Sequence, residues 1–161
     1  MKHRLQLSGR FRYERWHNET IVARHVFYNG ITTPGINALL DGDLDLDDLK
    51  IGLIDNASFS ALSAADTMAS HAGWIENTDY DEAARPDWGA AAATSGIKQN
   101  TTSVVFTFNA AVTIKGLFLT TNATKGGATG TLWSTGLLPT ADSPQIGSVG
   151  RVFYDLTGRE G

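Results

Sequence analysis

The chain has 161 residues, which is enough for one domain with a substantial core and short for two. Its formal net charge of −4 argues against general nucleic-acid binding, which needs a basic excess. It contains no cysteine, which excludes disulfides, thiolate zinc sites and cysteine nucleophiles. No stretch approaches the roughly 20 apolar residues of a membrane helix, and the polar N-terminus is unlike a signal peptide, so we expect no membrane contact.

Apolar and polar residues alternate between Leu5 and Trp16, and a second strand pattern covers residues 21–31. This pattern predicts a long β-hairpin over residues 5–31. Its outward face is rich in arginine and aromatic side chains, which suits an arm that lies on a neighbouring molecule. An ordinary edge hairpin with solvated charges fits the pattern equally well. The aromatic residues that we expect to be exposed here are Phe11, Tyr13, Trp16, Phe27 and Tyr28.

A short helix is predicted next, because Thr33 can act as its cap and Pro34 suits the first helical position. Ile36, Leu39 and Leu40 form its apolar stripe, and Asp41-Gly42 ends it. The following acidic segment, DGDLDLDDL over residues 41–49, invites comparison with a calcium loop. An EF-hand loop needs Gly at its sixth position and Glu at its twelfth, where this chain has Leu46 and Gly52. We therefore favour a solvated acidic loop.

Several further strands are predicted. Residues 50–55 read KIGLID and are typical of a buried strand. Residues 101–121 predict a hairpin of two strands around Asn109-Ala110-Ala111, in which Gly116 marks a bulge or a close backbone approach. Residues 131–138 and 150–157 add two more strands, and 139–147 read as a loop. Seven to nine short strands predict an all-β antiparallel β-sandwich, jelly-roll-like or Ig-like, as a single domain over 1–161 with 1–31 as a possible extended hairpin arm.

The chain offers few catalytic patterns. No serine lies in a G-x-S-x-G elbow, the glycine-rich residues 122–130 are not a P-loop, and His3, His17, His25 and His71 lack metal-ligand spacing. One cluster resembles a sugar-binding subsite or the active site of a small glycosidase, because carboxylates lie beside aromatic residues. Its members are Glu76, Asp79, Asp81, Glu82, Trp74, Tyr80 and Trp88. The ordinary interpretation is that the aromatic side chains, Trp74 foremost, pack the core while the acids face water. We expect no catalytic residue, no cofactor and no metal.

A series of stretches between Asn29 and Leu138 resembles a group of small virion structural proteins encoded by tailed bacteriophages, which includes capsid cement (decoration) proteins. The stretches are NGIT with Gly35, Asn37 and LLD at 39–41; IGLID at 51–55; SHAGW at 70–74 with Glu76, Thr78 and Tyr80; ARP at 84–86 with Trp88; TIKG at 113–116 with FL at 118–119; and KGG at 125–127 with GTLWS at 130–134. The acidic residues 43–48 and the C-terminal strand depart from that pattern.

The resemblance implies a β-sandwich that binds the outside of the major capsid protein shell and stabilises it, as a homodimer or homotrimer. It implies location on the virion, synthesis in the host cytoplasm, and no enzymatic activity. The residues that we expect to contact the shell are Arg10, Phe11, Arg12, Tyr13, Arg15 and Trp16, because such residue types dominate protein interfaces. Two alternatives stay open: a phage tail or fibre component, and a carbohydrate-binding module or small glycosidase.

Overall fold

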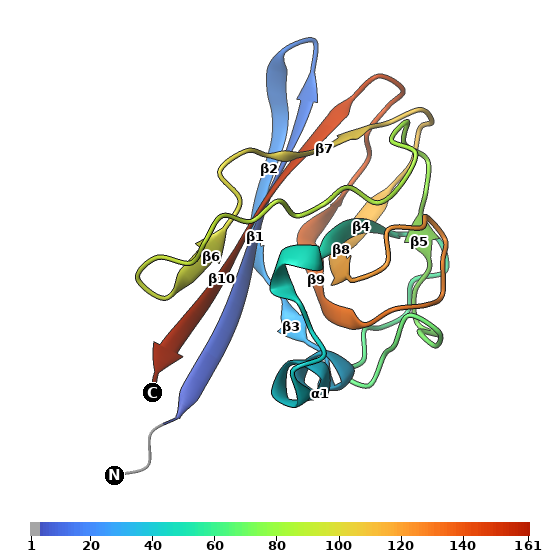
Figure 1. Ribbon diagram of the computed structural model, residues 1–161. Helices are drawn as coiled ribbons and strands as arrows, with labels where there is room; N and C mark the ends of the chain where they lie inside the picture. Colours follow the sequence, from blue (N-terminus) through green and yellow to red (C-terminus); the bar gives the residue numbers. More distant parts are fainter. Residues whose placement is uncertain (1–3) are drawn as a thin grey trace.

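The first sheet, sheet A, is built around two long strands that come from distant parts of the chain, β1 (Leu5–His17) and β10 (Val149–Glu160). They pair antiparallel over twelve successive residue pairs (Figure 1). β2 (Thr20–Tyr28) pairs with the other side of β1, whereas β6 (Ile97–Gln99) and β7 (Val104–Thr107) both pair with β10. The computed structural model describes residues 4–161.

The second sheet, sheet B, is also antiparallel and has the strand order β3-β9-β8-β4-β5. These strands are β3 (Gly30–Ile31), β9 (Leu132–Asp142), β8 (Ile114–Thr120), β4 (Lys50–Asp55) and β5 (Glu76–Asn77). Sheets A and B pack face to face, so the predicted all-β antiparallel sandwich is confirmed. A jelly-roll order of the strands stays a prediction.

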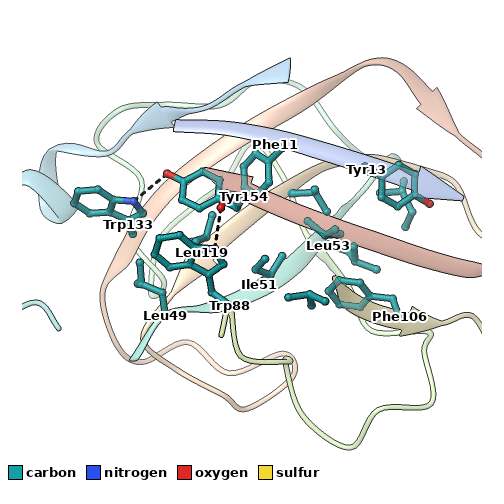
Figure 2. Close-up of a cluster of buried hydrophobic side chains, with 14 of the residues drawn as sticks. Phe11, Tyr13, Leu49, Ile51, Leu53, Trp88, Phe106, Leu119, Trp133 and Tyr154 are labelled. Carbon is teal, nitrogen blue, oxygen red and sulfur yellow. Dashed lines mark hydrogen bonds between the residues drawn. The ribbon is translucent and has the colours of Figure 1, made fainter. Parts of the chain in front are cut away.

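The core between the sheets is aromatic and is centred on Tyr154 of β10 (Figure 2). The Trp88 indole N–H donates to the Tyr154 carbonyl oxygen at 3.0 Å, and the Trp133 indole N–H donates to the Tyr154 hydroxyl oxygen at 3.4 Å. Phe11 packs against the Tyr154 ring with centroids 4.7 Å apart. The indole N–H groups of Trp88 and Trp133 thus find partners inside the core, which offsets the cost of burying them.

A second, smaller cluster lies on the outer side of sheet B. It consists of Ile54, Met68, Trp74, Phe118 and Leu132, with Phe59 and Leu62 packed against it. Residues 59–74 of the loop between β4 and β5 therefore cover this side of the sheet. Trp74 is buried, as predicted, but it anchors the loop to sheet B and does not lie between the two sheets.

The predicted helix is present as α1 (Thr33–Asp41), but its cap is Thr32 and not Thr33. Thr32 has an extended backbone, and its hydroxyl oxygen accepts a hydrogen bond from the Gly35 N–H at 3.0 Å. Gly42 ends the helix in the left-handed conformation, with φ of 78°, as expected. Ile36 and Leu40 of the predicted stripe are exposed, because the helix turns Gly35 toward β9.

The predicted hairpin over residues 101–121 is wrong. β7 pairs with β10 in sheet A, whereas β8 lies between β4 and β9 in sheet B. Residues 108–113 thus cross from one sheet to the other. The prediction for Gly116 is confirmed, since β8 shifts register there and a Cβ atom would collide with the carbonyl oxygen of Gly136.

Other expected strands are confirmed with altered limits. The strand over residues 50–55 is present as β4, and β10 includes residues 150–157. β9 continues through residues 139–142, which we expected to be loop. β1 and β2 form the predicted hairpin, but residues 30–31 belong to β3 in sheet B, so the possible arm is an integral part of the sandwich. Within residues 4–161, no helix is long and apolar enough to cross a membrane.

Gly52 provides a test of the packing on sheet B. The Phe118 ring lies where a Cβ atom at residue 52 would have to stand. We expect Gly52→Ala to lower the free energy of unfolding by roughly 1–3 kcal/mol, because the ring must move out of a packed site. Gly30→Ala is the matched control, since nothing lies within 4 Å of its Cβ position. Equal urea midpoints for the two variants would contradict this account.

The buried tyrosines predict an alkaline limit to stability. Burial raises the pKa of Tyr13 and of Tyr154, and the Asp142 carboxylate raises that of Tyr13 further. Above about pH 10 the unfolded chain loses these protons first, so stability is full below that pH and falls above it. Each buried tyrosine contributes a slope of about 1.4 kcal/mol per pH unit. The free energy of unfolding, measured with urea at pH 10 and pH 11, should fall less with pH for Tyr13→Phe than for the wild type. An equal fall in the two proteins would contradict this account.

Candidate functional site

The outer faces of the two sheets differ. The loop between β4 and β5 covers the outer face of sheet B, whereas the outward side chains of β1, β2 and β10 are exposed or half-buried, apart from Glu14. Alternation along these strands brings together five arginines, three aromatic residues and two carboxylates. We call this surface the arginine face; it consists of Arg10, Arg12, Arg24, Arg151, Arg159, Trp16, Tyr28, Phe153, Glu14 and Asp155.

The side chains of the arginine face lie in rows across the strands, because directly opposite residues in an antiparallel sheet share a face. Arg10 has Tyr28 on one side and Asp155 on the other, and its guanidinium is 2.6 Å from the Asp155 carboxylate. In the next row the Arg12 guanidinium lies over the Phe153 ring, 4.0 Å from its centroid. Both contacts hold a guanidinium in a defined orientation at the surface.

Glu14 lies at the centre of the third row and is the one buried charge of the arginine face. Its carboxylate accepts hydrogen bonds from Arg24 at 3.0 Å and from the Trp16 indole N–H at 3.2 Å, and Arg12 lies 3.6 Å away. The Arg151 guanidinium lies 5.2 Å from the centroid of the Trp16 ring. One buried carboxylate thus orients two arginines and one tryptophan.

Two hollows lie on this surface. One has a volume of about 460 Å³ and is lined by residues that include Arg10, Tyr28, Ile97 and Asp155. The other has a volume of about 360 Å³, and its walls include Arg12, Val26 and Phe153. The arginine face is therefore a sheet surface with shallow relief that can accept protruding side chains of a partner.

The six residues that we expected to contact a partner separate into two groups. Arg10, Arg12 and Trp16 lie on the arginine face. Phe11 and Tyr13 are fully buried between the sheets, and Arg15 points inward, with its Nε donating to the Asp142 carboxylate at 2.9 Å. Phe27 is buried as well, so the expected exposure of Phe11, Tyr13 and Phe27 is wrong. These rings lie on the side of β1 and β2 that packs against sheet B, where the core of a β-sandwich lies.

Arg24, Arg151 and Phe153 of the arginine face were not among the residues expected to contact a partner. The alternation of Val22, Arg24, Val26 and Tyr28 was a usable signal for β2, since only one of its faces can meet the core. No comparable signal exists for Arg151 and Phe153. Their place depends on the register between β1 and β10, which the local sequence does not reveal.

The cluster of acids and aromatic residues is part of the scaffold. Trp74, Tyr80 and Trp88 are each 1% exposed, so their rings offer no platform for stacking a sugar. The Arg85 guanidinium donates to both oxygens of Glu76, at 2.8 and 2.7 Å, and also to the carbonyl oxygens of Asn122 and Gly127. This buried pair fastens the glycine-rich residues 122–130 to β5.

Other residues singled out in the sequence also have partners within the protein. Glu82 accepts hydrogen bonds from the N–H and hydroxyl of Thr107, and Asp81 accepts one from Asn109.

The histidines are dispersed over the fold. His71 stacks on Trp74, His25 stacks on Tyr13, and His17 contacts Ser148, whereas His3 lies outside the described residues. Asp47 pairs with Lys98 and Asp48 with Lys50. Among residues 4–161, no three His, Asp or Glu side chains are grouped so that they could hold a metal ion.

Comparison with known proteins adds no assignment. The chain matches no protein-family model, and no curated protein is significantly similar to it. Function is therefore inferred from the arginine face and from the resemblance of residues 29–138 described above.

The Arg85–Glu76 pair yields a stability prediction. Arg85→Met leaves the Glu76 carboxylate buried without its partner, so we expect a loss of about 3–5 kcal/mol in the free energy of unfolding. Arg10→Met is the control, because the Arg10–Asp155 pair is half-exposed and contributes less than about 1 kcal/mol. Urea unfolding at pH 7 measures both variants. A loss for Arg85→Met as small as for Arg10→Met would show that the pair does not organise the loop.

Proposed function

We propose that the protein is a structural component of a bacteriophage virion, a capsid cement protein that binds the outside of the major capsid protein shell and stabilises it. The observation that carries the proposal is the arginine face, a broad surface made of the residue types that dominate protein interfaces. The resemblance of residues 29–138 to phage virion proteins supports the same conclusion.

The resembling stretches and the arginine face occupy different parts of the fold. The stretches form α1, most of sheet B and the residues that surround Trp74, Arg85 and Gly126. β1, β2 and β10, which carry the arginine face, lie outside them. A scaffold of shared type would thus carry a face particular to this chain, as expected for proteins that each bind a different shell.

The dimensions of the arginine face suit a shell-binding role. Twelve residue pairs at about 3.3 Å per residue give a length of roughly 40 Å, and neighbouring strands are about 4.8 Å apart. The three strands that carry the face give an area of roughly 600 Å², which approaches the roughly 800 Å² that each partner contributes to a stable interface. Modest single contacts are sufficient for a cement protein when a homodimer or homotrimer binds several sites at once.

Particle composition is the direct test of this proposal. We expect the protein to co-sediment with phage particles from its source in a density gradient, in hundreds of copies per particle by quantitative mass spectrometry. Electron cryomicroscopy of the same particles should place it on the outer surface of the shell. A handful of copies would assign it to the tail or a fibre, and its absence from particles would overturn the virion proposal. A host cytoplasmic protein of similar abundance serves as the control for carry-over.

A further inference from the structure

The composition of the arginine face points to one class of partner. We propose that this face docks on an acidic protein surface, in which carboxylates lie beside apolar side chains, and not on nucleic acid. The inference rests on the proposed function only for the identity of the partner, which is the capsid shell.

Charge is distributed unevenly over the molecule. The outward side chains of β1, β2 and β10 include five arginines, two carboxylates and no lysine, a net charge of +3. The whole chain has a formal net charge of −4, so the remainder carries −7. A positive surface on a negative protein steers an acidic partner to that side and repels it from the others.

Exposed apolar side chains lie on the same side as the arginines. Nine large hydrophobic residues are exposed within residues 4–161, and four of them, Val22, Val26, Tyr28 and Ile97, lie on the outer side of sheet A. A solvated edge strand is normally polar on its outer side, whereas β2 alternates valine, arginine, valine and tyrosine there. Apolar side chains between the arginines contribute a favourable free energy of binding only if the partner buries them.

The guanidinium groups are accessible and already oriented. The side chains of Arg10, Arg12 and Arg24 are between 47% and 57% exposed, although each touches a carboxylate or an aromatic ring. A guanidinium has five N–H donors, so a contact on one side leaves others free to bind a carboxylate in bidentate fashion. Because these side chains are held in place, little conformational entropy is lost on binding.

The carboxylates of the face argue against nucleic acid. Glu14 and Asp155 lie among the arginines, where their negative charges would repel a continuous row of phosphates. A protein surface can place its own carboxylates opposite the arginines and apolar side chains opposite Val22 and Val26. The mixed pattern therefore favours protein over a polyanion.

Binding to empty shells tests the proposal. Shells assembled from the major capsid protein alone are mixed with the purified full chain, and the bound fraction is measured by sedimentation at 50 and 300 mM NaCl. We expect Arg12→Glu and Arg24→Glu each to weaken binding by about tenfold or more, and the affinity of the wild type to fall with salt. Arg12→Lys should have a smaller effect, since it keeps the charge and loses the planar contact with Phe153.

Lys115→Glu on β8 is the matched control, because it makes the same change of charge on the other sheet. Circular dichroism and urea midpoints establish that each variant is folded. Wild-type protein that does not bind shells overturns the proposed function and this inference with it. Wild-type binding that the arginine variants leave unchanged overturns this inference alone. Binding to duplex DNA that the same variants abolish would assign the face to nucleic acid instead.

Discussion

The antiparallel register of β1 against β10 is the constraint on which sheet A depends. It sets Arg10 opposite Asp155, Arg12 opposite Phe153 and Glu14 opposite Arg151, and these three rows make up most of the arginine face. A slip of one residue would turn Phe11 and Tyr13 to water and bring arginines into the core. Burial of those two rings therefore fixes the core and, through the alternation of side chains, fixes the pattern of charge on the opposite side of the sheet.

Buried charges have a different role in this protein from exposed ones. Asp142 of β9 accepts hydrogen bonds from Tyr13 and Arg15 of β1, and this contact ties sheet B to sheet A. Arg85 and Glu76 fasten a glycine-rich loop that has few apolar contacts of its own. In both places the partners satisfy each other inside the protein and have little left to offer a ligand. The exposed arginines keep free donors, which is why the functional proposal rests on them.

Much of the fold could be predicted from local sequence. The helix after Ile31 and the strand over residues 50–55 were predicted because each depends on nearby residues. The special role of Gly116 was predicted because a glycine inside a strand pattern is itself a local signal, although the contact that requires it is with distant Gly136. The hairpin over residues 101–121 was not, because alternation shows which side chains face a core and says nothing about which strand lies alongside. The candidate site was half predictable for the same reason: Arg10 and Arg12 follow from alternation in β1, whereas Phe153 reaches them only through a pairing between distant segments.

That long-range pairing also has a consequence for synthesis of the chain on the ribosome. β1 leaves the ribosome well before its main partner, residues 149–160, which is made about 130 residues later. At about 5–20 residues per second, the edge of β1 that pairs with β10 stays unpaired for roughly 7 to 26 seconds. A topology with such distant contacts folds slowly, and an unpaired strand edge in the meantime invites association with other chains. Sheet A, including its arginines, is thus assembled after the strands of sheet B have been made, and production of the protein will be sensitive to conditions that favour aggregation of nascent chains.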